Sequence, residues 1–113
     1  MSYNITPESS LLKGWTVVVT GAASGLGRCA AFVAAYQGAN VVLGDLNETN
    51  GTSTLAILQK EYPNIKAAFY KLDITNEDIV DEFMQKAEEE FGSVQGLLHC
   101  AGMLQPHCSP VAC

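Results

Sequence analysis

The chain has 113 residues, enough for one domain, and its 48% hydrophobic and 16% charged content is that of an ordinary globular protein. Twelve acidic against six basic residues give a formal charge of −6, which argues against a nucleic-acid or anionic-membrane partner. No apolar run has the length of a membrane span, and the N-terminus lacks a signal-peptide pattern, so we expect a cytoplasmic protein.

The first recognisable element is an apolar, β-branched run at residues 15–20, which follows a loose arm at residues 1–13. This run predicts a strand that is buried on both faces. A helix is predicted to begin a few residues later and to end near Gln37, where Gly38 stops it.

A glycine-rich turn, TGAASGLG at residues 20–27, joins this strand to the helix. A strand, such a turn and a helix in this order favour an anion, because the first N–H groups of the helix lack intrahelical acceptors and the helix dipole is positive there. We expect Gly21 to turn the chain, Gly25 to admit a pyrophosphate and Gly27 to let the helix pack against the strand.

Strands and helices continue to alternate along the rest of the chain. Strand patterns occupy residues 40–44, 66–72 and 95–100, and helix patterns occupy residues 48–61 and 75–91. In the last helix we expect Thr75 to be the N-cap, with Asp78 three residues later. Residues 104–113 form an irregular tail, so the sequence predicts a single domain over residues 1–113.

This alternation predicts a doubly wound, Rossmann-like α/β fold with a parallel sheet that stops after four strands. The expected strand order is 3-2-1-4, which places the first strand in the centre. Its carboxyl end then lies where the winding reverses, and ligands bind at that point in such folds.

Asp45 ends the second strand, 18 residues after Gly27. A dinucleotide fingerprint has an acidic residue about 20 residues after the glycines, where it accepts hydrogen bonds from the adenosine ribose. A carboxylate there repels a 2′-phosphate and no arginine follows it directly, so we expect NAD to bind in preference to NADP. The alternative is a strand-end carboxylate that only faces water.

Asp73 and Ile74 follow the third strand in the same way. The carboxylate could accept a hydrogen bond from the adenine amino group while the isoleucine packs on the ring. Alternatively, Asp73 helps to cap the helix that begins just beyond it.

The cysteines do not suggest a metal site. The chain has no C-x-x-C pair, and Cys29 and Cys100 lie in predicted core elements, so we expect both thiols to be buried. His99 and Cys100 could be combined with His107, Cys108 and Cys113, but their spacing matches no zinc pattern, and we expect no metal.

Together these motifs resemble the short-chain dehydrogenase/reductase family, whose members transfer hydride between a nicotinamide cofactor and an alcohol or carbonyl. The resemblance rests on the glycine turn, Asp45, Asp73-Ile74 and the segment Cys100-Ala101-Gly102, and it covers roughly residues 14–103. It implies that the following residues contact the cofactor: Gly21, Ser24, Gly25, Leu26, Gly27, Asp45, Asp73, Ile74, Cys100, Ala101 and Gly102.

The chain departs from the family at two places. The family's Asn-Asn-Ala-Gly segment reads His99-Cys100-Ala101-Gly102 here, and a thiol cannot supply both the donor and the acceptor of an amide. The family's catalytic Ser and Tyr-x-x-x-Lys lie on a fifth strand and the helix after it. The only Tyr-x-x-x-Lys here is Tyr62 to Lys66, and Pro63 separates it from any helix.

The sequence therefore predicts a truncated, inactive relative with no catalytic residues of its own. The alternative is a non-catalytic protein that binds a dinucleotide or another protein. The exposed edge of the fourth strand would allow such a chain to associate with a second copy. The substrate cannot be predicted from this sequence.

Overall fold

The computed structural model describes residues 11–23 and 25–100, in which strands and helices alternate as predicted. The elements are β1 (Thr16–Thr20), α1 (Gly25–Tyr36), β2 (Asn40–Asp45), α2 (Glu48–Glu61), β3 (Ala67–Lys71), α3 (Glu77–Phe91) and β4 (Gly96–His99). The predicted tail and most of the predicted arm lie outside the described residues.

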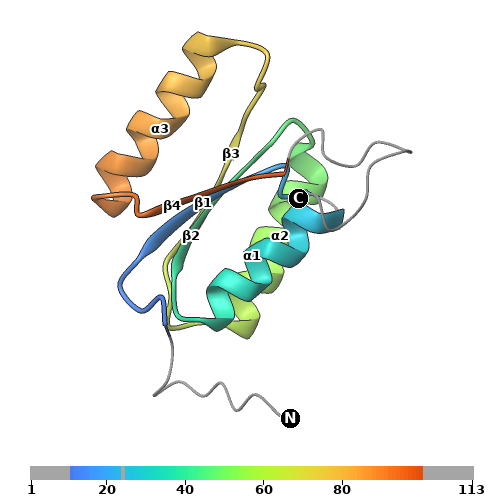
Figure 1. Cartoon of the computed structure of the whole chain (residues 1–113). Coiled ribbons are helices and arrows are strands. Elements are labelled where there is room, and N and C mark those ends of the chain that lie inside the picture. The colour runs from blue at the N-terminus through green and yellow to red at the C-terminus, as the bar shows by residue number, and fades with distance from the viewer. Residues whose placement is uncertain (1–10, 24, 101–113) are drawn as a thin grey trace.

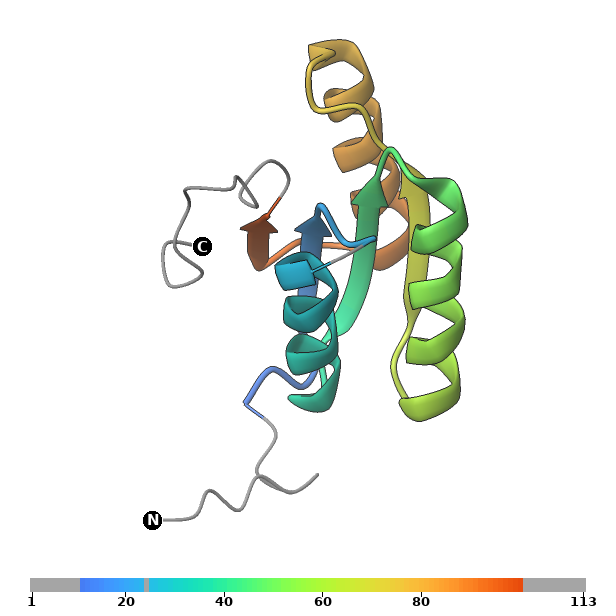
Figure 2. The same cartoon turned by 90° about the vertical axis from the view of Figure 1, so that its right-hand side faces the viewer.

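The four strands form one parallel sheet in the order β3-β2-β1-β4, which confirms the predicted topology. All four arrows in Figure 2 point the same way. We call the edge where the strands end the carboxyl edge. The chain passes from β1 to β2 on one side of β1 and returns to β4 on the other, so Thr20 lies at the reversal of winding.

Helices cover both faces of the sheet, with α1 and α2 on one side and α3 on the other (Figure 1). Side chains alternate along β1, so Val17 and Val19 pack on the α1–α2 side while Val18 packs on the α3 side. The largest buried side chain from a helix is Leu58 on the first side and Phe83 on the second. Two thin apolar cores therefore hold the sheet in place.

The start of α3 differs from the prediction. Its N-cap is Asn76, whose side chain accepts hydrogen bonds from the backbone N–H groups of Asp78 and Ile79. The predicted cap Thr75 is wrong, because its hydroxyl donates to Asp73 Oδ1 at 2.6 Å instead. The other boundary signals hold: Gly38 and Gly92 adopt φ values of 93° and 80°, just after α1 and α3.

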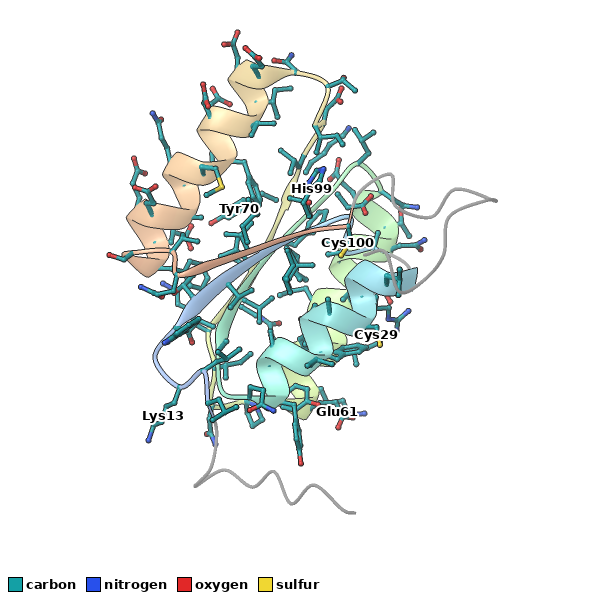
Figure 3. The ribbon with its side chains drawn as sticks, in the orientation of Figure 1. Lys13, Cys29, Glu61, Tyr70, His99 and Cys100 are labelled. Atoms are coloured by element: carbon teal, nitrogen blue, oxygen red, sulfur yellow. The ribbon has the colours of Figure 1, made fainter. Side chains whose placement is uncertain are left out.

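The predicted burial of Cys29 is also wrong, whereas Cys100 is buried as expected. Figure 3 shows Cys29 on the outer side of α1. The buried face of this helix is made by its small residues, Gly27, Ala31, Ala34 and Ala35. Cys29 is on another face of the helix, where it is exposed.

The first described residues, 11–14, form a turn that packs on the end of α1. The N–H of Leu12 donates to the carbonyl of Gln37 at 3.0 Å, and the Leu12 side chain packs on the α1–α2 core. Residues 11–13 therefore belong to the fold and not to the loose arm that the sequence indicated.

Candidate functional site

The glycine turn has the geometry that its sequence predicts. Gly21 and Gly25 adopt positive φ values of 73° and 57°, a region that residues with a Cβ seldom occupy. An ideal Cβ on Gly27 would lie 1.9 Å from the carbonyl oxygen of Gly21, so only glycine allows α1 to start this close to the turn. Ser24 lies outside the described residues.

The turn delivers the start of α1 to the carboxyl edge of the sheet. The first turn of this helix contains no acidic residue, and Leu26 is half-buried within it. Its leading N–H groups have no acceptor within the helix and carry the positive end of the dipole. The turn can therefore stabilise an anionic group such as a pyrophosphate.

Three consecutive backbone N–H groups of the turn donate hydrogen bonds to the end of β2, which holds the turn in place. Those of Gly21 and Ala22 donate to the carbonyl of Gly44 at 2.8 and 3.3 Å. The third, from Ala23, donates to Asp45 Oδ2 at 3.0 Å. The predicted ribose acceptor thus lies directly against the predicted phosphate turn.

The Asp45 carboxylate is oriented on its other side as well. Its Oδ1 accepts the backbone N–H of Asn47 at 2.8 Å, and Asn47 is the N-cap of α2. The side chain is half-buried. Each oxygen uses one of its lone pairs for a backbone N–H and keeps another for a hydroxyl donor.

Asp73 lies near Asp45, because Leu72, the residue just before Asp73, donates its backbone N–H to the Asp45 carbonyl at 3.0 Å. The hydroxyl and the backbone N–H of Thr75 both donate to Asp73 Oδ1, and these bonds lower the pKa of the Asp73 carboxyl. Asp73 thus orders the loop before α3, while Asn76 is the cap.

Two apolar side chains flank these carboxylates at the carboxyl edge. Ile74, predicted from the sequence, is 41% exposed, and Leu46, which the sequence reasoning missed, is 57% exposed. Apolar side chains exposed beside hydrogen-bond acceptors suit a flat aromatic base. The position of Leu46 directly after Asp45 could have been used to find it.

The end of β4 is joined to the end of β1 by a bond that the sequence reasoning did not foresee. His99 Nδ1 and Thr20 Oγ1 are 2.7 Å apart, and the N–H of Cys100 donates to the Thr20 carbonyl at 3.0 Å. Figure 3 shows His99 and Cys100 at the same end of the sheet, opposite Lys13 and Glu61. His99 therefore links the two strands where the first asparagine of the motif is missing. Ala101 and Gly102 lie outside the described residues.

The Tyr62–Lys66 pair is far from this edge. Tyr62 is the C-cap of α2, and Lys66 directly precedes β3, so both lie at the edge where the strands begin. Lys66 Nζ donates to the carbonyl of Glu90 at the end of α3.

No group of three potential metal ligands occurs among the described residues, and none of their helices is long and apolar enough to cross a membrane. His107, Cys108 and Cys113 of the metal site considered above lie outside the described residues.

The comparison with known families decides the relationship. The sequence model of the family described as short chain dehydrogenase matches residues 15–111. This chain belongs to the short-chain dehydrogenase family. The matched range includes the glycine turn, Asp45 and Asp73.

Individual relatives agree with this assignment. Short-chain dehydrogenase reductase 3c of Arabidopsis thaliana is 37% identical over 95 residues, which is 84% of this chain and 35% of the relative. The crystal structure of a short-chain dehydrogenase/reductase from Burkholderia phymatum in complex with NAD superposes with a TM-score of 0.72 and 31% identity. The superposition covers 76% of this chain and 30% of the Burkholderia phymatum chain.

A second solved structure that resembles this chain carries a different cofactor. An alcohol dehydrogenase from the archaeon Thermococcus sibiricus, complexed with 5-hydroxy-NADP, superposes with a TM-score of 0.70 and 28% identity, over 74% of this chain and 35% of that one. The relatives thus support a nicotinamide dinucleotide without deciding which one. The chain spans about a third of the length of the curated relatives that it matches.

Proposed function

We propose that this chain binds the adenosine diphosphate half of a nicotinamide dinucleotide and prefers NAD to NADP. The observation that supports this most is that the half-buried Asp45 carboxylate accepts a hydrogen bond from the Ala23 N–H of the glycine turn, with an N–O distance of 3.0 Å. A carboxylate accepts hydrogen bonds from the ribose hydroxyls, but it repels the negative charge of a 2′-phosphate.

The remaining residues then divide by the part of the cofactor they face. Gly21, Ser24, Gly25, Leu26 and Gly27 form the pyrophosphate subsite at the start of α1. Asp73 and Ile74 hold adenine, with Leu46 on the other side of the ring. Cys100, Ala101 and Gly102 follow β4 and contact the cofactor beyond the pyrophosphate.

Calorimetric titration with NAD tests this proposal, and a matched pair of glycine variants locates the site. Gly25→Ala and Gly92→Ala both put a Cβ on a residue with positive φ, 57° and 80°, so each variant carries backbone strain. Gly25 lies at the proposed pyrophosphate, whereas Gly92 lies at the opposite edge of the sheet. We expect Gly25→Ala to weaken NAD binding and Gly92→Ala to leave it unchanged; equal affinities would refute the assignment of the site.

We further propose that these 113 residues do not transfer hydride by themselves. In support, Tyr62 and Lys66 lie at the edge of the sheet opposite the cofactor turn, and the rest of this sequence contains no other Tyr-x-x-x-Lys. Purified chain should therefore show no NAD-dependent oxidation of alcohols. Turnover that survives both further purification and the Tyr62→Phe substitution would contradict this proposal.

A second candidate function is self-association through β4. Within the described part of the chain this strand pairs only with β1, and Leu97 and Leu98 are 56% and 41% exposed. An apolar groove of about 530 Å³ lies between β4 and α1, and none of its lining residues is charged. Two copies could pair their β4 edges antiparallel about a two-fold axis and cover both grooves.

Sedimentation velocity over a range of concentrations tests self-association. We expect a dimer that Leu97→Lys converts to a monomer, because the substitution puts a charge on the exposed edge. A wild-type chain that stays monomeric at every concentration would exclude this candidate.

We also propose that the protein is cytoplasmic, which subcellular fractionation would test.

A further inference from the structure

The carboxylate of Asp45 accepts a hydrogen bond from the glycine turn in this structure. The described part of the glycine turn donates three hydrogen bonds to β2: two go to the carbonyl of Gly44, and the third goes to the Asp45 side chain. Its partner Ala23 is buried, with 5% of its surface exposed. A buried N–H that loses its acceptor is costly, so the turn would have to rearrange if the carboxylate were removed.

We propose that Asp45 is a positioning residue for the pyrophosphate subsite, in addition to its role as ribose acceptor in the function proposed above. By holding the Ala23 N–H, the carboxylate fixes the turn two residues before α1 begins at Gly25. It thereby fixes the direction in which the start of α1 meets an anion. Its second bond, to the N–H of Asn47, keeps the carboxylate from rotating away from the turn.

Because Asp45 is charged, the effect of its positioning role on anion binding can be distinguished from the effect of its charge. A carboxylate beside a pyrophosphate repels it, so removal of the charge alone should strengthen the binding of the anion. A positioning role predicts the opposite: removal should weaken binding, because the N–H groups of the turn lose their arrangement. The sign of the change distinguishes the two effects.

The probes are ADP and 2′,3′-dideoxy-ADP, which keeps the adenine and the pyrophosphate but lacks both ribose hydroxyls. For Asp45→Ala we expect calorimetry to show an affinity for dideoxy-ADP lowered by about tenfold or more, the usual size of one lost hydrogen bond to a charged group. The affinity for ADP should fall further, by the contribution of the hydroxyls. An unchanged or increased affinity for dideoxy-ADP would overturn the proposal.

Glu48→Ala is the matched control. Glu48 is an exposed carboxylate three residues after Asp45; it pairs with Lys71 on the neighbouring strand. The variant removes the same charge close to the site and leaves the Asp45 bonds to the turn in place. Its affinity for both probes should stay within about twofold of the wild type or increase, as for an exposed charge. A loss as large as that of Asp45→Ala would overturn the proposal.

Amide hydrogen exchange without nucleotide separates this inference from the proposed function. We expect Asp45→Ala to accelerate exchange at Ala23 while the Gly21 amide, bonded to Gly44, keeps its protection. Wild type that binds neither probe would refute dinucleotide binding, and exchange at Ala23 would still decide whether Asp45 holds the turn. Unchanged exchange at Ala23 would overturn the inference, even where NAD binds.

Asp45→Asn provides a second variant in case the alanine form does not fold. Its amide has one acceptor oxygen, and its NH₂ group must face one of the two backbone N–H groups that the carboxylate now accepts. We expect values between wild type and Asp45→Ala in both measurements. An asparagine variant equal to wild type in dideoxy-ADP affinity and in Ala23 exchange would overturn the proposal.

Discussion

The Gly27→Ala substitution tests how closely α1 must approach the turn. The added Cβ would lie 1.9 Å from the Gly21 carbonyl oxygen and 2.5 Å from its carbon. Atoms in contact lie about 3.5–4.0 Å apart, so helix and turn would have to separate by about 1.5 Å. Overpacking typically costs about 1–3 kcal/mol, and here the clash is with backbone that cannot rotate away. We therefore expect a loss of about 3 kcal/mol in the free energy of unfolding.

Urea unfolding followed by circular dichroism measures this loss, and Gly96→Ala is its control. A Cβ on Gly96 would meet Val17 Cγ2 at 3.6 Å, an ordinary contact, and alanine costs less chain entropy than glycine in a strand. The control should be neutral or stabilising by up to about 1 kcal/mol. The reasoning is refuted if Gly27→Ala unfolds within about 0.5 kcal/mol of wild type, the spread of ordinary surface substitutions.

Three further predictions concern polar groups. The Tyr70 hydroxyl is enclosed and makes no hydrogen bond of good geometry among the described residues, and burial, with the nearby Glu90 carboxylate, raises its pKa to about 12. Tyr70→Phe should therefore stabilise the fold by up to about 1 kcal/mol. In the wild type, deprotonation of Tyr70 should cost stability as the pH rises from about 10 to about 12, and the phenylalanine variant should not show this loss. A variant that unfolds at lower urea than the wild type would contradict the prediction. Thr75→Val removes the hydroxyl that lowers the pKa of Asp73, so an NMR titration should show that this pKa rises. Asp73 should then contribute less to the stability that the protein loses as the pH falls below about 4. An unchanged titration would count against this prediction. A double-mutant cycle of Thr20→Val and His99→Ala should give a coupling of about 1 kcal/mol for their bond, and no coupling would show that it contributes nothing.

The order of the elements and the position of the site could be predicted from the sequence. The β-branched run of β1 and the apolar stripe of α3 indicate their types clearly, and alternation of strands with helices leaves few topologies. Because parallel strands end at the same edge of a sheet, the positions of Asp45 and Asp73 at two strand ends are enough to place them together. These inferences need only local patterns and chain connectivity.

The errors arose where neighbouring residues compete or where one face of a helix must be chosen. Thr75 and Asn76 are both good caps, and the choice depended on Asp73 taking the threonine hydroxyl. The residues of α1 are mostly small, so their pattern does not reveal which face is buried, and Cys29 was placed on the wrong one.

The bond between Thr20 and His99 shows a different limit. The two residues are 79 positions apart, and they meet only because β1 and β4 pair in one register, which places them side by side. The sequence shows that the asparagines are missing, but it does not show that a histidine at the same edge reaches the threonine. Side-chain contacts between distant strands require the register of the sheet.

The most direct test of the central claim is the ratio of the dissociation constants for NAD and NADP, measured by calorimetry on the 113-residue chain. If Asp45 accepts the ribose hydroxyls beside the glycine turn, NAD should bind at least about tenfold more tightly than NADP, since the 2′-phosphate would bring its negative charge against the carboxylate. Equal affinity for the two cofactors, or no binding of either, would contradict the account.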